Sequence, residues 1–375
     1  MSGAGQEEQL SAMLADLSEL VLCESFSADL DAVARSADLV AVQGARLLGA
    51  EPERLVVDGV THLRWAFGAP RVLLLGHHDT VWPMGSLATH PWSVAEGVAR
   101  GPGVFDMKAG LVQMFHALAS LPSLEGVCVL VTGDEEVGSD TSRALIEETA
   151  RSCVATFVLE ASADGGALKT GRKGTSQYEL VVHGRAAHSG LEPEKGVNAA
   201  VEAAHLILAL GEVAAEVNVG APEDWRTTVT PTVVTAGSAT NTVPATATVS
   251  VDVRVPTLAA QSKVDTALRA LTATVSGAQL EVRGGPNRPP LEEMSSADLF
   301  RRASALAQRQ GLPPLASASV GGASDGNFTA GLGCPTLDGL GAIGGGAHAD
   351  HEHVIVGEMV PRSRLLAALV AEVVR

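Results

Sequence analysis

The sequence predicts an α/β protein whose mainly parallel sheet is covered by helices on both faces, interrupted by an inserted α+β domain. Two observations predict it. Short, wholly apolar runs alternate with helical stretches up to about residue 173, which is typical of a three-layer parallel-sheet domain. The pattern then changes to strand, helix, strand, strand, helix, strand, which is the order of a ferredoxin-like fold. After about residue 286 the α/β pattern of the first part returns. We therefore expect a discontinuous domain, 1–173 and 286–375, with 174–285 inserted.

The elements of the first domain follow from hydrophobic periodicity. Residues 7–48 predict two helices, because apolar residues recur at helical spacing. Continuous apolar runs predict buried strands at 71–76, 127–131 and 155–159, and 106–118 predicts the crossover helix between the first two. Two further helices are expected near 296–310 and 361–375.

The elements of the inserted domain are also predicted from hydrophobic periodicity. Strands are expected at 175–183, 227–236, 245–255 and 278–283, and helices at 196–213 and 258–275. The Gly- and Pro-rich residues 284–290 mark its end.

Composition excludes several classes of function. The 26 Lys and Arg residues against 43 Asp and Glu give a formal charge of −17, which would repel nucleic acid and anionic membrane surfaces. There is no run of 18 apolar residues and no signal-like N-terminal segment, so we expect neither a membrane span nor a secretory leader. The four cysteines are scattered and form no CxxC pair, which favours a reduced, cytoplasmic protein.

Acids and histidines follow the predicted strands of the first domain. In open α/β sheets, ligands bind beyond the carboxyl ends of the strands. The candidates from successive segments are His77, His78 and Asp79, then Asp106, then Glu135 and Glu136, then Glu160, and finally His348, His351 and His353. His77 and Asp79, two residues apart, would project together while His78 points away.

Each of these residues has an ordinary alternative. A single acid after a strand is commonly a helix cap or a solvated loop residue, and a lone histidine is more often structural than a ligand. Their recurrence at one sheet edge favours a cation site, because converging acids would otherwise repel one another. Carboxylate and imidazole ligands without thiolates favour a zinc-type catalytic site. No Gly-x-Ser-x-Gly motif is present to support a serine hydrolase instead.

Three motifs then occur in order, and they resemble the dinuclear zinc peptidase family of glutamate carboxypeptidase, aminoacylase, acetylornithine deacetylase and succinyl-diaminopimelate desuccinylase. They are Leu75-Gly-His77-His78-Asp79-Thr80, Gly101-Pro-Gly-Val-Phe-Asp106-Met-Lys108 and Gly133-Asp-Glu135-Glu136-Val-Gly138-Ser139. The likeness continues through Gly184-Arg-Ala-Ala-His188-Ser-Gly190, Asn241-Thr-Val-Pro244, Val251-Asp-Val-Arg254 and Gly345-Gly-Ala-His348. It covers nearly the whole chain, including the inserted domain.

The resemblance implies a role for each matching residue. Asp106 would bridge two zinc ions, with His77 and Glu160 completing one site and Glu136 and His348 the other; Co²⁺ or Mn²⁺ are possible replacements. Glu135 would be the general base, and Asp79 would orient His77. His348 is preferred to His351 and His353 because it follows the Gly344–Gly346 run, and Glu352 also fits a family pattern.

For the inserted domain, the resemblance implies a lid that also forms a homodimer. His188 would reach the partner subunit's active site and hold the substrate carbonyl, while Asn241 and Arg254 would grip the substrate carboxylate. The implied activity is hydrolysis of an amide in a small molecule or short peptide, releasing an amino acid with a free carboxylate. The residues around Trp82 most resemble the glutamate carboxypeptidase branch. The alternatives are an N-acyl-amino-acid deacylase or desuccinylase and, from another class, a catalytically silent binding or scaffold protein.

Overall fold

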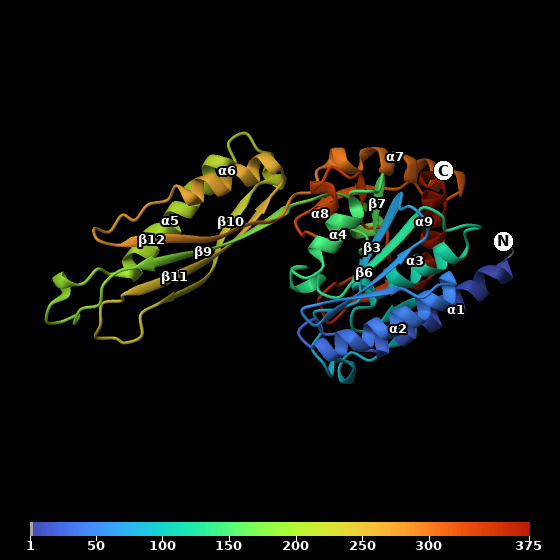
Figure 1. The fold of residues 1–375 in the computed structure, drawn as a ribbon, viewed down its shortest axis with the longest axis horizontal. Coiled ribbons are helices and arrows are strands. Elements are labelled where there is room, and N and C mark those ends of the chain that lie inside the picture. The colour runs from blue at the N-terminus through green and yellow to red at the C-terminus, as the bar shows by residue number, and fades with distance from the viewer. Residues whose placement is uncertain (1–2) are drawn as a thin grey trace. The chain divides into compact units, whose positions relative to one another are not determined.

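The computed structural model describes residues 3–375, which form two compact units (Figure 1). The first unit takes the chain up to Gly171, together with Glu292–Val320 and Ser324–Arg375. The second takes Arg172–Leu291 and the short segment Gly321–Ala323. Arg172 holds that segment, because its Nη1 donates to the carbonyls of Gly322 at 3.2 Å and Ala323 at 3.3 Å.

A six-stranded sheet lies at the centre of the first unit. Its order is β1-β2-β6-β3-β7-β14. The strands are β1 (Glu53–Val57), β2 (Val60–Ala66), β3 (Val72–His77), β6 (Val127–Thr132), β7 (Ala155–Val158) and β14 (Thr336–Leu337). β6, β3, β7 and β14 run parallel, whereas β1 and β2 form an antiparallel hairpin that joins the sheet at β6. The sheet is therefore parallel where the candidate ligands follow the strands.

Helices cover both faces of this sheet, and the burial of β3 shows why. All six residues of β3 are buried. Leu74 belongs to a large core with the helices of one face, while Leu73 and Leu75 pack with Ile146 and Phe328 on the other. The helices are α1 (Gly3–Leu22), α2 (Leu30–Leu48), α3 (Ala109–Ala119), α4 (Arg143–Ala150), α7 (Glu293–Arg309), α8 (Gly326–Gly331) and α9 (Met359–Val373). This is the predicted three-layer arrangement.

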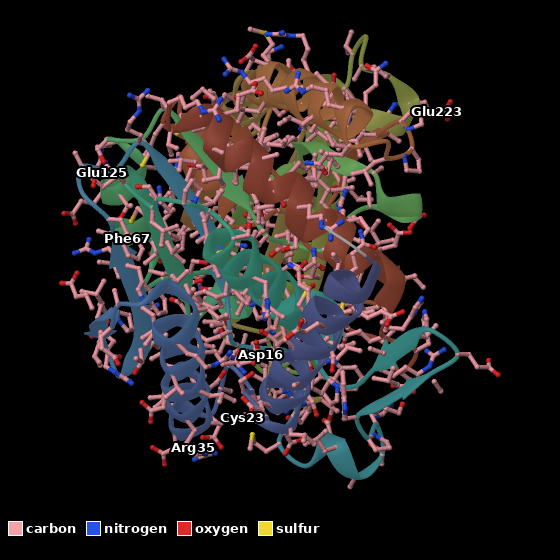
Figure 2. The ribbon with its side chains drawn as sticks, turned by 90° about the vertical axis from the view of Figure 1, so that its right-hand side faces the viewer. Asp16, Cys23, Arg35, Phe67, Glu125 and Glu223 are labelled. Carbon is pink, nitrogen blue, oxygen red and sulfur yellow. The ribbon has the colours of Figure 1, made fainter. Side chains whose placement is uncertain are left out.

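Asp16 of α1 connects the first three helices through a buried charge. Its carboxylate accepts hydrogen bonds from Arg46 of α2 and, at 2.7 Å, from His116 of α3. Figure 2 labels Asp16 on α1, together with Cys23 just beyond the end of that helix. The N-terminal helices are thus fixed against α3, the helix that follows Asp106.

Two small sheets complete the first unit. One has the order β15-β16-β5-β4 and the other pairs β13 with β8. Their bounds are β4 (Ser93–Ala95), β5 (Val98–Arg100), β8 (Leu168–Arg172), β13 (Ser317–Val320), β15 (Gly344–Gly345) and β16 (His353–Ile355). The first of these sheets joins the segment before Asp106 to the segments on either side of His348.

The prediction of a helix over 106–118 was wrong at its start. The regular helix α3 begins at Ala109, and Asp106 has φ −115° and ψ 95°, outside the helical region. The peptide bond between Asp106 and Met107 is cis. Asp106 therefore belongs to an irregular turn rather than to a helix.

The second unit is an antiparallel sheet with two helices on one face. Its strands are β9 (Gly174–His183), β10 (Thr228–Ala236), β11 (Thr246–Val255) and β12 (Gln279–Arg288), in the order β10-β11-β9-β12. The helices α5 (Ala199–Val217) and α6 (Leu258–Arg269) share one core with the sheet. α6 ends six residues earlier than predicted, but order and topology are those of a ferredoxin-like fold.

Within residues 3–375, no helix has both the length and the hydropathy needed to cross a bilayer.

Candidate metal and active site

Five candidate ligands gather at one edge of the first unit's sheet. β6, β3 and β7 are neighbours and parallel, so their carboxyl ends open on the same side. His77 ends β3, Glu136 lies in a short turn after β6, and Glu160 follows β7. The irregular turn before α3 adds Asp106, and the loop after β15 adds His348.

One cluster joins His77, Asp106 and Glu160. His77 Nε2 lies 3.3 Å from Asp106 Oδ1 and 3.5 Å from Glu160 Oε1. The three ligand atoms lie within 4.8 Å of one another. All three side chains are at least four-fifths buried, with His77 only 1% exposed.

A second cluster uses the other oxygen of Asp106. His348 Nε2 lies 3.4 Å from Asp106 Oδ2 and 3.2 Å from Glu136 Oε2. This site opens to solvent on the side of His348, whose side chain is 49% exposed, whereas that of Glu136 is 6% exposed. The two carboxylate oxygens of Asp106 therefore face two different sets of ligands.

These donor sets fit divalent metal ions. Ligand atoms about 2.0–2.2 Å from a shared zinc ion lie about 3.3–3.6 Å apart when the coordination is tetrahedral. The measured separations between histidine and carboxylate atoms, 3.2–3.5 Å, agree with that spacing. Glu136 Oε1 is also buried, with no hydrogen-bond partner among the described residues. A cation would compensate this buried charge.

The electrostatics of the clusters arise from the same contacts. Hydrogen bonds to Asp106 and Glu136 raise the pKa of His348 to about 10. Burial lowers the pKa of His77, but hydrogen bonds to Asp106, Asp79 and Glu160 outweigh it and raise that pKa well above its usual value. Burial raises the pKa of Glu136 to about 7. Burial would also raise the pKa of Asp106, yet the two histidines lower it, so this carboxylate stays ionised.

Comparison with known proteins decides the family. The model of peptidase family M20/M25/M40 matches residues 73–372, which include both clusters. The chain belongs to peptidase family M20/M25/M40.

Related enzymes match most of the chain. Carboxypeptidase G2 from Pseudomonas sp. (strain RS-16) is 30% identical over 97% of this chain and 89% of its own length. Succinyl-diaminopimelate desuccinylase from Phenylobacterium zucineum is 27% identical over 83% of this chain and 85% of its own. The crystal structure of the M20 metallo-carboxypeptidase Sso-CP2 from Sulfolobus solfataricus shares the fold, with a TM-score of 0.73 at 16% identity over 96% and 98% of the two chains. The protein is an M20-family hydrolase.

Asp79 holds two parts of this M20 site at once. The carbonyl of Asp79 lies 3.0 Å from His77 Nδ1, and its carboxylate Oδ1 lies 3.4 Å from the same nitrogen. The same carboxylate accepts hydrogen bonds from the backbone N–H groups of Glu135 and Glu136, each at 3.2 Å. Burial would raise the pKa of Asp79, but His77 lowers it below its usual value. An ionised Asp79 therefore orients the His77 ring and the turn of Glu135 and Glu136 together.

Sequence reasoning missed two residues that support these groups. Ser27 donates to Asp79 Oδ2 at 2.7 Å. Asp325 accepts from Ser139 and, at 3.0 Å, from Thr132, which flank the turn of Glu135 and Glu136. All three hydrogen bonds join segments more than fifty residues apart, so no local signal could have predicted them. Among the described residues, His348 belongs to a metal cluster, whereas His351 and His353 belong to neither.

The second unit places His188 beside the segment of Asn241. The carbonyl of Asn241 accepts from Ser189 N at 3.0 Å, and His188 forms a β-bridge with Thr242. His188 Nδ1 accepts from the N–H groups of Gly190 and Leu191, each at 3.1 Å. With Nδ1 accepting these two bonds, Nε2 is the ring nitrogen that can donate a hydrogen bond.

Arg254 lies at the opposite end of this sheet. Thr246 pairs with His183 at one end of β11, and Arg254 pairs with Thr175 at the other. The strand between them spans about 26 Å at about 3.3 Å per residue. Pairing continues beyond Thr246, away from Arg254, through Gly184 N to Ala245 O and Val243 N to Ala187 O. Asn241 and Arg254 of one chain therefore cannot bind the same substrate carboxylate.

Arg254 also has a partner of its own. It forms two hydrogen bonds with Asp252, from Nε at 2.9 Å and from Nη2 at 3.0 Å. Asp252 fixes the direction of the guanidinium group, and the N–H groups of Nη1 lie outside this pair.

Proposed function

We propose that this M20 hydrolase binds two divalent metal ions, zinc by the nature of its ligands, and cleaves an amide bond to release an amino acid with a free carboxylate. The observation that carries the proposal is Asp106, whose Oδ1 and Oδ2 each face a separate histidine–carboxylate pair. His77 and Glu160 would hold one ion, Glu136 and His348 the other, with Asp106 shared between them. The donor set also accepts Co²⁺ or Mn²⁺.

The residues around the metals then have distinct tasks. When bound, the two ions supply Lewis acidity to the scissile carbonyl and to the attacking water. Glu135 accepts the proton of that water and returns it to the leaving amine. Asp79 keeps the His77 ring and the Glu135 backbone in place. His188 donates a hydrogen bond from Nε2 to the carbonyl oxygen as negative charge develops there.

For the substrate, we propose an activity like that of glutamate carboxypeptidase. The support is the relative named carboxypeptidase G2, at 30% identity over nearly the whole chain. Arg254 suits a substrate carboxylate, since a guanidinium binds anionic oxygens in a directed way. The desuccinylase relative supports the second candidate, an N-acyl-amino-acid deacylase or desuccinylase. The presence of every proposed ligand and of Glu135 argues against a silent scaffold.

A matched substrate panel tests this proposal. The protein would be stripped with a chelator and reloaded with Zn²⁺, Co²⁺ or Mn²⁺. Hydrolysis would then be measured for three derivatives of glutamate that carry an aminoacyl, an acetyl or a succinyl group on the amine. The same three derivatives of glutamate α-amide, which lack the free α-carboxylate, would be measured beside them. We expect metal-dependent hydrolysis, the highest kcat/KM for aminoacyl-glutamate, and little for the α-amide. A preference for succinyl groups would favour the second candidate, and no hydrolysis with two ions bound would favour the scaffold.

We also propose that the protein works as a homodimer in which His188 of the partner subunit acts at each metal site. Support comes from the separation of His188 and Arg254, about 26 Å or more along one sheet. Because two groups so far apart in one chain cannot both reach the same substrate, one of them would have to come from a second copy. A further support is β10, an edge strand whose residues 232–236 are all exposed, including Val233 at 56%. Leu208 of α5, the helix that packs beside β10, is 72% exposed. The outer edge of β10, which has no neighbouring strand in the sheet and lies beside exposed apolar residues, suits pairing with a second copy.

Subunit mixing tests this arrangement. Glu135→Gln and His188→Ala, each nearly inactive alone, would be unfolded together and refolded as a mixture. If His188 acts across the dimer, half of the randomly paired dimers contain one intact site, which restores roughly a quarter of the wild-type rate. No gain over the separate variants, in a mixture that does form hybrid dimers, would place His188 and Glu135 in the same chain's site.

A further inference from the structure

The carboxylate of Glu352 is the meeting point of three separate segments of the first unit. Its Oε1 accepts from the backbone N–H groups of Phe105 at 2.8 Å and Asp106 at 3.0 Å. Its Oε2 accepts from Gly103 N at 3.0 Å and from Trp82 Nε1 at 2.7 Å. Glu352 is only 3% exposed, so its carboxylate and the four donors that it binds have little access to water.

The turn that carries Asp106 needs such an acceptor. The N–H groups of Gly103, Phe105 and Asp106 come before the regular helix, which begins at Ala109, so no preceding helical turn supplies carbonyl acceptors for them. Glu352 takes that place from a position some 246 residues away in the chain. Burial raises the pKa of Glu352, and the three backbone donors oppose that rise. Two donors at each oxygen leave no room for a proton on the carboxyl group, which favours the ionised form.

Glu352 also belongs to the loop that carries His348. Ala349 N donates to Gly346 O and Glu352 N donates to Ala349 O, each at 2.9 Å, so a tight turn connects His348 to Glu352. One side chain thus ties the loop of His348 to the turn of Asp106, two ligands of the second cluster.

We propose that Glu352 is a positioning residue for the metal centre, which holds Asp106 in its bridging orientation before any metal binds. The inference rests on the proposed function, because it assigns Glu352 a role in building that site. Removing an acceptor of this kind should weaken metal binding by about 10–100-fold. A carboxylate that served only to stabilise the fold would change the melting temperature and leave the metal affinity of the folded protein unaltered.

Glu352→Gln is the direct test. The amide keeps the size of the side chain but presents an NH₂ group to two of the four donors. The nearby Asp350→Asn is a matched control, since Asp350 is highly exposed and contacts His90 rather than the Asp106 turn. Zinc affinity would be measured by equilibrium dialysis against a chelator-buffered zinc series, with folding checked by circular dichroism. We expect about 10–100-fold weaker binding in Glu352→Gln and no change in Asp350→Asn.

The double variant Trp82→Phe/Glu352→Gln sharpens the result. Removing the indole N–H leaves one donor fewer facing the amide, so we expect this variant to recover part of the lost affinity. Equal zinc affinity in wild type and Glu352→Gln would overturn the inference and leave the proposed function intact. A wild type that binds no zinc would overturn both.

A measurement on the unaltered protein keeps the test independent of how the variants fold. In the chelator-stripped wild type, hydrogen exchange at the amides of residues 103–106 should already be slow, because Glu352 holds them without metal. Exchange at the rate of an open loop, becoming slow only after zinc is added, would show that the metal and not Glu352 orders the turn.

Discussion

The candidate residues of the two units differ in burial and in what their side chains contact. In the first unit, His77, Asp106 and Glu160 are mostly buried and contact one another directly. In the second, His188 is exposed and Arg254 half-buried, and the hydrogen bonds of their side chains are local, to residues within three positions along the chain. One set forms a site by itself, whereas the other consists of separate groups that need a substrate or a second chain to act together.

The two sets of residues control different properties of the enzyme. A cluster of mutually contacting ligands determines whether metal binds at all. Exposed donors on a separate sheet can stabilise a transition state or bind a carboxylate, but they cannot alter metal content. Substitutions in the two units should therefore separate metal binding from catalysis.

The largest catalytic effect that leaves metal bound should come from Glu135→Gln. Loss of the general base should lower kcat by about 10²–10⁴-fold, because the amide cannot accept the proton of the attacking water. Metal content should remain that of the wild type, as Glu135 is not among the clustered ligands. Glu148→Gln, an exposed glutamate on α4, is the control. Loss of metal together with activity would instead make Glu135 a ligand.

His188→Ala should have the next largest effect. Loss of one donor to the developing oxyanion should lower kcat by about 10²–10³-fold with metal content unchanged. His205→Ala, an exposed histidine on α5 of the same unit, should retain the wild-type rate. If both variants show similar kinetics in steady-state assays, His188 has no special role.

Arg254→Lys should raise KM with little change in kcat. Lysine keeps the charge but loses the planar fork, which should weaken carboxylate binding by roughly tenfold. Arg283→Lys is a close control, since Arg283 on the same sheet makes the equivalent pair with Glu281 at 2.8 and 2.9 Å. A KM unchanged in Arg254→Lys, or raised equally in both variants, would remove Arg254 from the substrate site.

The smallest expected effect is the release of protons when metal binds to the chelator-stripped protein. In chelator-stripped protein near neutral pH, His77 and His348 should be protonated, since their neighbouring carboxylates raise both pKa values. Metal binds neutral imidazole and ionised carboxylate, so loading should release about two protons from the histidines and a further fraction of a proton from Glu136, whose pKa is about 7. Apparent affinity should therefore rise with pH. Titration calorimetry in buffers of different ionisation enthalpy measures the number. Release of about one proton fewer is expected for His348→Asn, and no release from the wild type would contradict the ligand assignment.

Burial explains which parts of the fold could be predicted from sequence. β3 is buried on both faces, so its residues form a continuous apolar run that predicts a central strand. The β1–β2 hairpin escaped prediction, although Asp58 and Gly59 at its turn, with φ 48° and 87°, form an Asp-Gly pair typical of such hairpins. The start of α3 was missed because the turn before it is stabilised by the distant Glu352.

The same reasoning applies to the site. The gathering of His77, Asp79, Glu136 and Glu160 at one sheet edge could be anticipated, because each ends or follows a strand there. The separation of Asn241 from Arg254 depends on strand register, which the motifs do not contain. Ser27 and Asp325 act through contacts between distant segments, so only the folded structure reveals them.

If two metal ions share Asp106, removing its carboxylate should change the number of ions that each chain binds. Elemental analysis of wild type and Asp106→Ala, with folding verified and amide hydrolysis assayed on the same samples, should give about two ions per chain in the wild type. In the variant, both the tightly bound metal and the activity should be lost together. Two ions retained in Asp106→Ala, or a wild type that stays metal-free and inactive after zinc is added, would show that Asp106 does not bridge two catalytic ions.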